Sequence, residues 1–127
     1  MAKPPKPTEA ELGILNVLWE AGPSTVREVM ERLSVGKPAG YTTVLKQLQI
    51  MTEKALVVRD ESSRTHVYKA AQAATRTRSR MVGDLIDRAF QGSTSRMVMQ
   101  ALSTRRASPA ELAAIRELLD NLEEKSK

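Results

Sequence analysis

Apolar residues recur at helical spacing along the first part of the chain, and capping residues bound each apolar stretch. Thr8 and Glu11 have the spacing of a capping box, and Gly22 ends the stretch that follows, which predicts a first helix between them. Thr25 and Glu28 repeat this spacing ahead of a shorter apolar stripe. The pattern therefore predicts two helices in succession.

A third helix is predicted from about Tyr41 to Lys54, after a break marked by Gly36, Pro38 and Gly40. Threonine, lysine and glutamine occupy most of its circumference, which leaves a polar face for contacts outside the core. Its apolar face is predicted to consist of Val44, Leu45, Leu48, Met51 and Ala55.

Beyond the third helix the apolar period changes from that of a helix to that of a strand. Leu56–Arg59 and Thr65–Tyr68 are short β-prone runs, and the polar residues 60–64 between them are typical of a flexible turn. These runs predict a β-hairpin. Residues 1–70 therefore have the order helix, helix, helix, hairpin.

The helical period returns from Ala71 onward and predicts three more helices. The first is long and ends at Gly92, the second begins near Ser93, and the third opens at Ser108 with a capping box. On the last helix, Leu112, Ile115, Leu119 and Leu122 fall at i, i+3, i+7 and i+10, the spacing of a narrow helix–helix seam. The predicted dimerisation residues are Leu85, Ala89, Phe90, Val98, Leu102, Leu112, Ile115, Leu119 and Leu122.

The predicted fold class is mainly α with a small β-hairpin wing. Residues 1–70 are expected to form a winged helix-turn-helix domain, because that fold has the same order of three helices and a hairpin. Residues 71–127 are expected to form a helical dimerisation domain, since a small three-helix segment buries its apolar stripes best in a shared interface. Packing of these stripes on the long helix of the same chain is the alternative.

The amino-acid composition excludes several kinds of functional site. The chain of 127 residues has no cysteine and one histidine, which excludes disulfides, thiolate metal sites and His-rich metal centres. One Trp, two Tyr and one Phe are too few for a module that stacks RNA bases on aromatic rings. No signal peptide or membrane span is visible, so we expect a soluble, cytoplasmic protein without a cofactor.

An enzyme is not expected, because no group of residues has the arrangement that catalysis needs. Asp60, Ser62, Ser63 and His66 lie close together in sequence, but on a hairpin tip they would lack a buried acid and an oxyanion hole. Residues 36–40 lack the spacing of a Walker phosphate loop. A hydrolase that uses His66 is therefore the weakest interpretation.

The polar face of the third helix and the hairpin tip carry residue types that bind DNA. Hydroxyl groups at a helix N-terminus suit phosphates, and lysine and glutamine suit guanine and adenine edges. No acid occurs between Glu31 and Glu53, and the net charge of +5 permits a polyanionic partner. A polar face that serves only solubility is the alternative. The candidate contacts are Thr42, Thr43, Lys46, either Gln47 or Gln49, and on the hairpin Arg64, with Arg59 beside it.

Four segments resemble the penicillinase repressor family, which includes repressors of the BlaI, MecI and CopY types. They are residues 7–19 (PTEAELGILNVLW), 24–30 (STVREVM), 40–48 (GYTTVLKQL) and 64–68 (RTHVY), in the expected order and spacing. The resemblance implies a homodimeric repressor whose winged helix binds a palindromic, double-stranded DNA operator. The contacts that it implies on the third helix are Tyr41, Thr42, Thr43, Lys46 and Gln47.

The resemblance also implies release from the operator by proteolysis through a sensor metalloprotease system. Well-studied members are cut at an Asn–Phe bond in the helix after the long one, and the corresponding bond here, Gln100–Ala101, departs from that pattern. Copper sensing is not expected, because that branch needs a C-terminal cysteine motif. The leading interpretation is thus a sequence-specific transcriptional repressor. The alternative is a winged helix that docks onto another protein without specific DNA binding.

Overall fold

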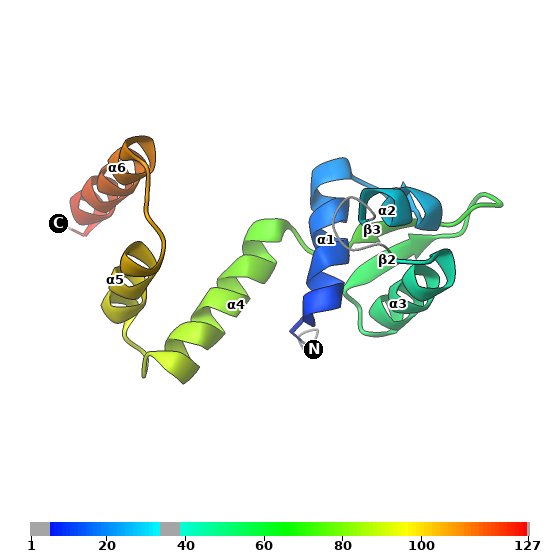
Figure 1. The fold of residues 1–127 in the computed structure, drawn as a ribbon, viewed down its shortest axis with the longest axis horizontal. Helices are drawn as coiled ribbons and strands as arrows, with labels where there is room; N and C mark the ends of the chain where they lie inside the picture. Colours follow the sequence, from blue (N-terminus) through cyan, green and yellow to red (C-terminus); the bar gives the residue numbers. More distant parts are fainter. Residues whose placement is uncertain (1–5, 34–38, 127) are drawn as a thin grey trace. The chain divides into compact units, whose positions relative to one another are not determined.

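The computed structural model describes residues 6–33 and 39–126 (Figure 1). It forms two compact units, residues 1–82 (the N-terminal unit) and 83–127 (the C-terminal unit). The predicted fold class, mainly α with a small hairpin, is confirmed, and the predicted break at Gly36 and Pro38 lies outside the described residues. The elements are α1 (Glu9–Ala21), β1 (Ser24–Thr25), α2 (Val26–Leu33), α3 (Tyr41–Glu53), β2 (Val57–Asp60), β3 (Val67–Ala70), α4 (Ala74–Ala89), α5 (Thr94–Thr104) and α6 (Pro109–Lys125).

Local capping determines where the first two helices begin. The Thr8 hydroxyl accepts a hydrogen bond from the Glu11 amide, and the Glu11 carboxylate accepts one from the Thr8 amide, which completes the predicted capping box of α1. Thr25 and Glu28 make the same reciprocal pair ahead of α2. Gly22 ends α1 with a φ of 81°, a left-handed conformation that glycine adopts without strain.

The hairpin belongs to a three-stranded antiparallel sheet in which β3 lies between β1 and β2. The sequence pattern missed β1, because a two-residue strand has no alternation to detect. The predicted strands Leu56–Arg59 and Thr65–Tyr68 also begin too early. Asp60 pairs with Val67 at the end of the ladder, so residues 61–66 form an exposed loop.

The core of the N-terminal unit lies between the three helices and the sheet. It is built from aliphatic side chains and one aromatic ring, Tyr68, which is 1% exposed. Helix α3 contributes Val44, Leu48 and Met51 to this core. Because these three side chains point inward, the opposite side of α3 faces outward. The complete core is Ile14, Leu15, Leu18, Val26, Val29, Val44, Leu48, Met51, Leu56, Val57 and Tyr68.

The predicted apolar face of α3 is one residue too long. Ala55 lies beyond the helix with a φ of 64° and is exposed, because the chain turns there to enter β2. Leu56 follows as a buried residue and donates its amide hydrogen to the Met51 carbonyl oxygen at 2.9 Å. The turn thus ends α3 tightly against its own last core residue.

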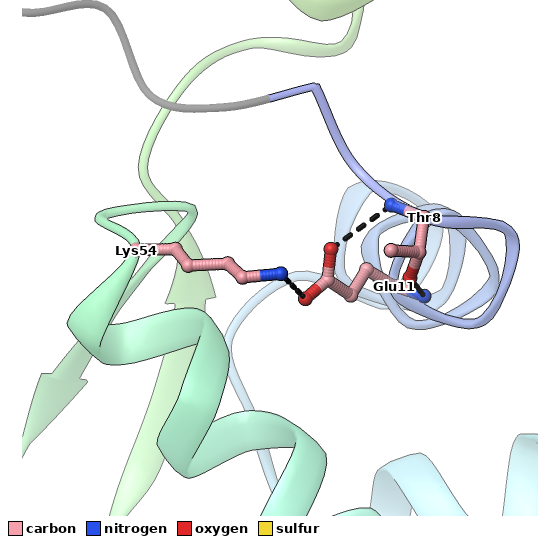
Figure 2. Close-up of polar contacts among 3 residues, drawn as sticks. All are labelled: Thr8, Glu11 and Lys54. Carbon is pink, nitrogen blue, oxygen red and sulfur yellow. Dashed lines mark hydrogen bonds and ion pairs between the residues drawn. The ribbon is translucent and has the colours of Figure 1, made fainter.

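A partly buried ion pair joins the start of α1 to the end of α3 (Figure 2). Glu11 is 1% exposed, and its Oε2 accepts a hydrogen bond of 2.8 Å from Nζ of Lys54, the C-capping residue of α3. Burial raises the pKa of Glu11, but the hydrogen bonds from Lys54 and Thr8 and the lysine charge outweigh it, so the pKa is lowered. Glu11 therefore caps one helix and anchors another.

The start of α4 packs on α1 within the N-terminal unit. The Trp19 indole donates a hydrogen bond of 3.0 Å to the Gln72 carbonyl oxygen, and the Arg78 guanidinium lies 5.3 Å from the centre of the Trp19 ring. Thr77 is buried on the same turn of α4. These contacts attach the first turns of α4 to the N-terminal unit.

The helices of the C-terminal unit have good local caps but bury almost nothing. Ser93 caps α5, and Ser108 and Glu111 form the predicted capping box of α6. Neither α5 nor α6 contains a buried residue. Their apolar stripes are therefore available for contacts outside the described chain.

Candidate nucleic-acid interface

The outward side of α3 is polar and carries one cation. Thr42, Lys46 and Gln49 are exposed, and their spacing of four and three residues aligns them on one face, opposite the buried stripe. Gly40 precedes α3 without a side-chain cap, and the first turn contains no acid. The positive end of the helix dipole is thus not offset by a carboxylate of its own first turn.

The predicted contacts on α3 do not all share this face. Thr43 and Gln47 line an apolar groove of about 480 Å³ next to α1, together with Gly13 and Ile14. Gln47 is half-buried there, whereas Gln49 is exposed beside Lys46. Of the two glutamines that the sequence left open, Gln49 is the one that shares the outward face.

The two arginines of the hairpin have different surroundings. Arg59 is half-buried, makes an ion pair with Glu61, and has its pKa raised by a hydrogen bond to Tyr68 and by the Glu61 charge. Arg64 is exposed on the loop between β2 and β3. Arg59 therefore serves the hairpin itself, and Arg64 is the better placed of the two for an outside partner.

A polar cleft of about 480 Å³ separates the hairpin loop from the two helices beside it. Tyr41 of α3 and Arg64 of the hairpin loop, both predicted contacts, line it. The sequence interpretation missed Arg27, which lines the same cleft from the first turn of α2. The sequence could have pointed to Arg27, because a cation in the first turn of a helix opposes the helix dipole and is not favoured by helix stability. The full lining is Thr25, Val26, Arg27, Tyr41, Leu45, Arg64, Thr65 and His66.

Of the four residues that a hydrolase would need, Asp60, Ser62 and Ser63 make contacts within the hairpin loop, and His66 lies beside them in the sequence. Asp60 accepts a hydrogen bond from the Ser62 amide at 2.9 Å, which lowers the pKa of Asp60. The Ser63 hydroxyl donates to the Thr65 carbonyl oxygen at 2.8 Å. These are turn contacts, and each of the four residues is exposed.

The predicted dimerisation residues divide into exposed and half-buried positions. Phe90, Leu112 and Ile115 are half-buried within the unit, and Ala89 is exposed. Three further exposed apolar residues, Val82, Met99 and Leu118, were not predicted. The large apolar side chains of this segment that are at least 39% exposed are Val82, Leu85, Val98, Met99, Leu102, Leu118, Leu119 and Leu122.

The Gln100–Ala101 bond lies inside α5, and both of its residues are exposed. The Gln100 carbonyl oxygen accepts hydrogen bonds from the hydroxyls of Ser103 and Thr104. Within the residues described, no three acidic or histidine side chains are grouped to hold a metal ion. The described residues also include no helix that is long and apolar enough to cross a membrane.

Comparison with known proteins gives consistent matches. The penicillinase repressor family matches residues 7–121. Proteins named transcriptional regulator BlaI from two Mycobacterium tuberculosis strains, CDC 1551 and H37Rv, are 31% identical over 124 residues, which is 97% of this chain and 89% of theirs.

Two solved structures share the fold at 24% identity, and each covers 59% of this chain and 92% of its own. One is the Bacillus licheniformis BlaI monomer in complex with the blaP half-operator, with a TM-score of 0.50. The other is the DNA-binding domain of the repressor BlaI, with a TM-score of 0.51. These likenesses show that the chain contains the fold of a BlaI DNA-binding domain.

Proposed function

The chain belongs to the penicillinase repressor family, and on that premise we propose that it is a transcriptional repressor that binds an operator specifically as a homodimer. The observation that carries the proposal is the exposed face of α3, where Thr42, Lys46 and Gln49 stand opposite the core stripe. A relative with a similar fold has been solved in complex with a half-operator. The proposal assigns the chain a regulatory role and no catalytic one.

In the proposed complex, α3 enters the major groove with its N-terminus toward a phosphate. The unopposed dipole and the hydroxyls of Thr42 and Thr43 set the register on the backbone. Lys46 reaches a guanine edge or a phosphate, and glutamine reads adenine. Gln47 reads a base only if it turns out of its groove, whereas Gln49 already faces outward.

The hairpin and the first residue of α3 complete the proposed interface. Arg64 extends from the hairpin loop and contacts the backbone beside the groove that α3 occupies. Tyr41 is 46% exposed at the start of α3 and lines the same cleft as Arg64. A phenol in this position can donate a hydrogen bond to a phosphate oxygen.

The proposed homodimer forms through the apolar stripes of residues 83–127. Leu119 and Leu122 of α6 are 51% and 54% exposed, and Leu85, Val98 and Leu102 on the two preceding helices are at least 39% exposed. A set of exposed leucines and valines of this extent is typical of a protein interface. A second copy of the chain offers an identical set, which a twofold interface pairs with itself.

Release by a sensor metalloprotease is the part of the proposal that rests on the family resemblance. The corresponding bond, Gln100–Ala101, lies within helix α5. A protease needs an extended backbone, so cleavage there requires α5 to unwind and to lose the contacts of the Gln100 carbonyl oxygen with Ser103 and Thr104. The proposal is therefore that release includes local opening of α5.

Footprinting of the purified chain on the DNA upstream of its own gene tests the function. We expect two symmetric protected half-sites about one helical turn or a multiple of it apart, with two chains per duplex by sedimentation. Binding should fall steeply between about 50 and 200 mM salt as counterions are released. Absence of a protected region, or binding that salt leaves unchanged, would favour a protein-docking winged helix instead.

A further inference from the structure

The cleft between the hairpin loop and α2 gathers cations from segments far apart in the sequence. Arg27 comes from α2, Arg64 and His66 from the hairpin loop, and Tyr41 from the first turn of α3. Arg27, Arg64 and His66 are all exposed. Three groups that carry or can take a positive charge thus converge on one space of about 480 Å³.

The chemistry of the cleft matches one repeat of a nucleic-acid backbone. Its floor includes Val26, which is buried, and Leu45, which is half-buried, and such a surface suits the apolar face of a deoxyribose. Two exposed arginines also line it, and the fork of donors on a guanidinium binds phosphate oxygens in pairs. No acid is among the described residues that line it. An anion in the cleft would relieve the mutual repulsion of its cations.

The carboxylates nearest in sequence to the lining residues are already engaged. The Glu28 carboxylate accepts the Thr25 amide hydrogen, which lowers the pKa of Glu28. The Glu61 carboxylate is paired with Arg59, and the Asp60 carboxylate accepts the Ser62 amide hydrogen. Arg27 is not explained by helix stability either, because it stands in the first turn of α2 against the helix dipole. A ligand with negative charge gives this arginine a role.

We propose that the cleft binds a backbone phosphate of the bound operator, held by Arg27 and Arg64, and that protonation of His66 strengthens this contact. The inference rests on the proposed function and adds to it a defined phosphate site and a dependence of operator affinity on pH. The phosphate favours the charged imidazole, so binding tightens as the pH falls. The sign follows from linkage, since an anion beside an imidazole favours the protonated form of the ring.

His66 is the only histidine of the chain, and imidazole is the side chain that ordinarily changes charge between about pH 5 and 8. The other ionisable groups that line the cleft are two guanidiniums and one phenol, and neither kind of group ordinarily changes charge in this range. Carboxylates such as Glu28, whose pKa is lowered, stay ionised. A change of affinity in this window is therefore attributable to His66.

Operator affinity measured from about pH 8 to pH 6 tests the proposal. The probe is a duplex of about 30 base pairs taken from the footprinted region, with a duplex of random sequence and the same length beside it. The full-length wild type is expected to bind both duplexes about 3- to 10-fold more tightly at the lower pH, because a shift of one pKa unit corresponds to a factor of ten. His66→Gln is expected to lose this gain, so that its affinity at pH 6 is no higher than its own affinity at pH 8.

The two arginines are tested by the dependence of binding on salt. Arg27→Gln and Arg64→Gln are each expected to weaken binding and to lower the salt slope by about one. Arg32→Gln is the matched control, since Arg32 lies on the same helix, is exposed, and does not line the cleft. It is expected to leave the slope unchanged.

Each outcome bears on the proposal. A pH gain retained by His66→Gln, or an unchanged salt slope in Arg27→Gln, would overturn the phosphate site while the proposed function stands. Failure of the wild type to bind the operator at any pH would remove the function and this inference with it. Tight binding of inorganic phosphate alone, measured by calorimetry without DNA, would assign the cleft to a free anion and overturn the backbone assignment.

Discussion

Replacing Lys54 with methionine is expected to destabilise the N-terminal unit by about 1–2 kcal/mol. The lysine Nζ lies 2.8 Å from Oε2 of Glu11, whose side chain is 2% exposed. Without the lysine, a buried carboxylate keeps the Thr8 amide as its hydrogen-bond donor. Loss of one partner of a fully buried pair costs about 3–5 kcal/mol. The Lys54 side chain is 35% exposed, and water reduces the cost accordingly.

The variant Glu11→Gln separates the charge from the hydrogen bond, because an amide oxygen can still accept the Thr8 amide hydrogen. The pKa of Glu11 in the folded chain is below its ordinary value of 4.5, since the contacts with Lys54 and Thr8 outweigh burial. The stabilisation is therefore complete above pH 4.5 and is lost as the pH falls through the lower folded value. Between about pH 5 and pH 3 the wild type is expected to lose more stability than Glu11→Gln.

Urea unfolding at fixed protein concentration measures both effects. Trp19 is the only tryptophan and is bonded to the Gln72 carbonyl oxygen, so its fluorescence reports on the N-terminal unit. A loss of about 1.5 kcal/mol moves the midpoint by roughly 0.5–1.5 M urea. Lys46→Met is the matched control on the same helix, and its effect is expected to stay within about 0.5 kcal/mol. Equal losses in Lys54→Met and Lys46→Met, or equal acid sensitivity in Glu11→Gln and wild type, would refute the reasoning.

Three further predictions concern the proposed operator complex. Lys46→Ala is expected to cost about 1–3 kcal/mol of specific binding if it reads a base, or to lower the salt slope by about one if it meets a phosphate; Lys125→Ala should change neither. Leu119→Asp is expected to convert the dimer to a monomer in sedimentation because it places a charge in the apolar seam, whereas Glu117→Gln on the opposite face of α6 should leave the dimer intact. Removal of residues 105–127 is expected to weaken operator binding strongly, because the two half-sites are then bound independently. An unchanged salt slope and affinity in Lys46→Ala, a dimeric Leu119→Asp chain, or a truncated chain with wild-type affinity would each contradict its prediction.

Features determined by neighbouring residues were predictable from the sequence. The capping boxes at Thr8, Thr25 and Ser108 were each predicted and are each present, because a cap depends on two residues three positions apart. The order of helices and hairpin was predicted for the same reason, since the apolar period is a local property. The ends of the strands were not predictable in this way, because the ladder ends where Asp60 pairs with Val67 and such pairing joins residues on different strands.

Contacts between distant segments could not be predicted from these patterns. Glu11 was identified as a cap, but its bond to Lys54 joins residues 43 positions apart and depends on how α1 packs beside α3. The choice between Gln47 and Gln49 likewise depends on the neighbour of α3, because Gln47 lines a groove together with residues of α1 and Gln49 does not. A periodic pattern gives the angle of a residue around its helix, but not which neighbour lies there.

The positions that local stability leaves unexplained are the ones that carry the proposals. Arg27 opposes the dipole of its own helix, Tyr41 exposes an aromatic ring at the start of α3, and Leu119 and Leu122 expose apolar surface along α6. In a chain whose caps and periods otherwise agree with its fold, such conflicts are expected at binding sites. The proposed partners would resolve each conflict: a phosphate for Arg27 and Tyr41, and a second apolar stripe for the leucines. Operator affinity and dimerisation should therefore be lost separately, the first on substitution in the cleft and the second on substitution in the seam.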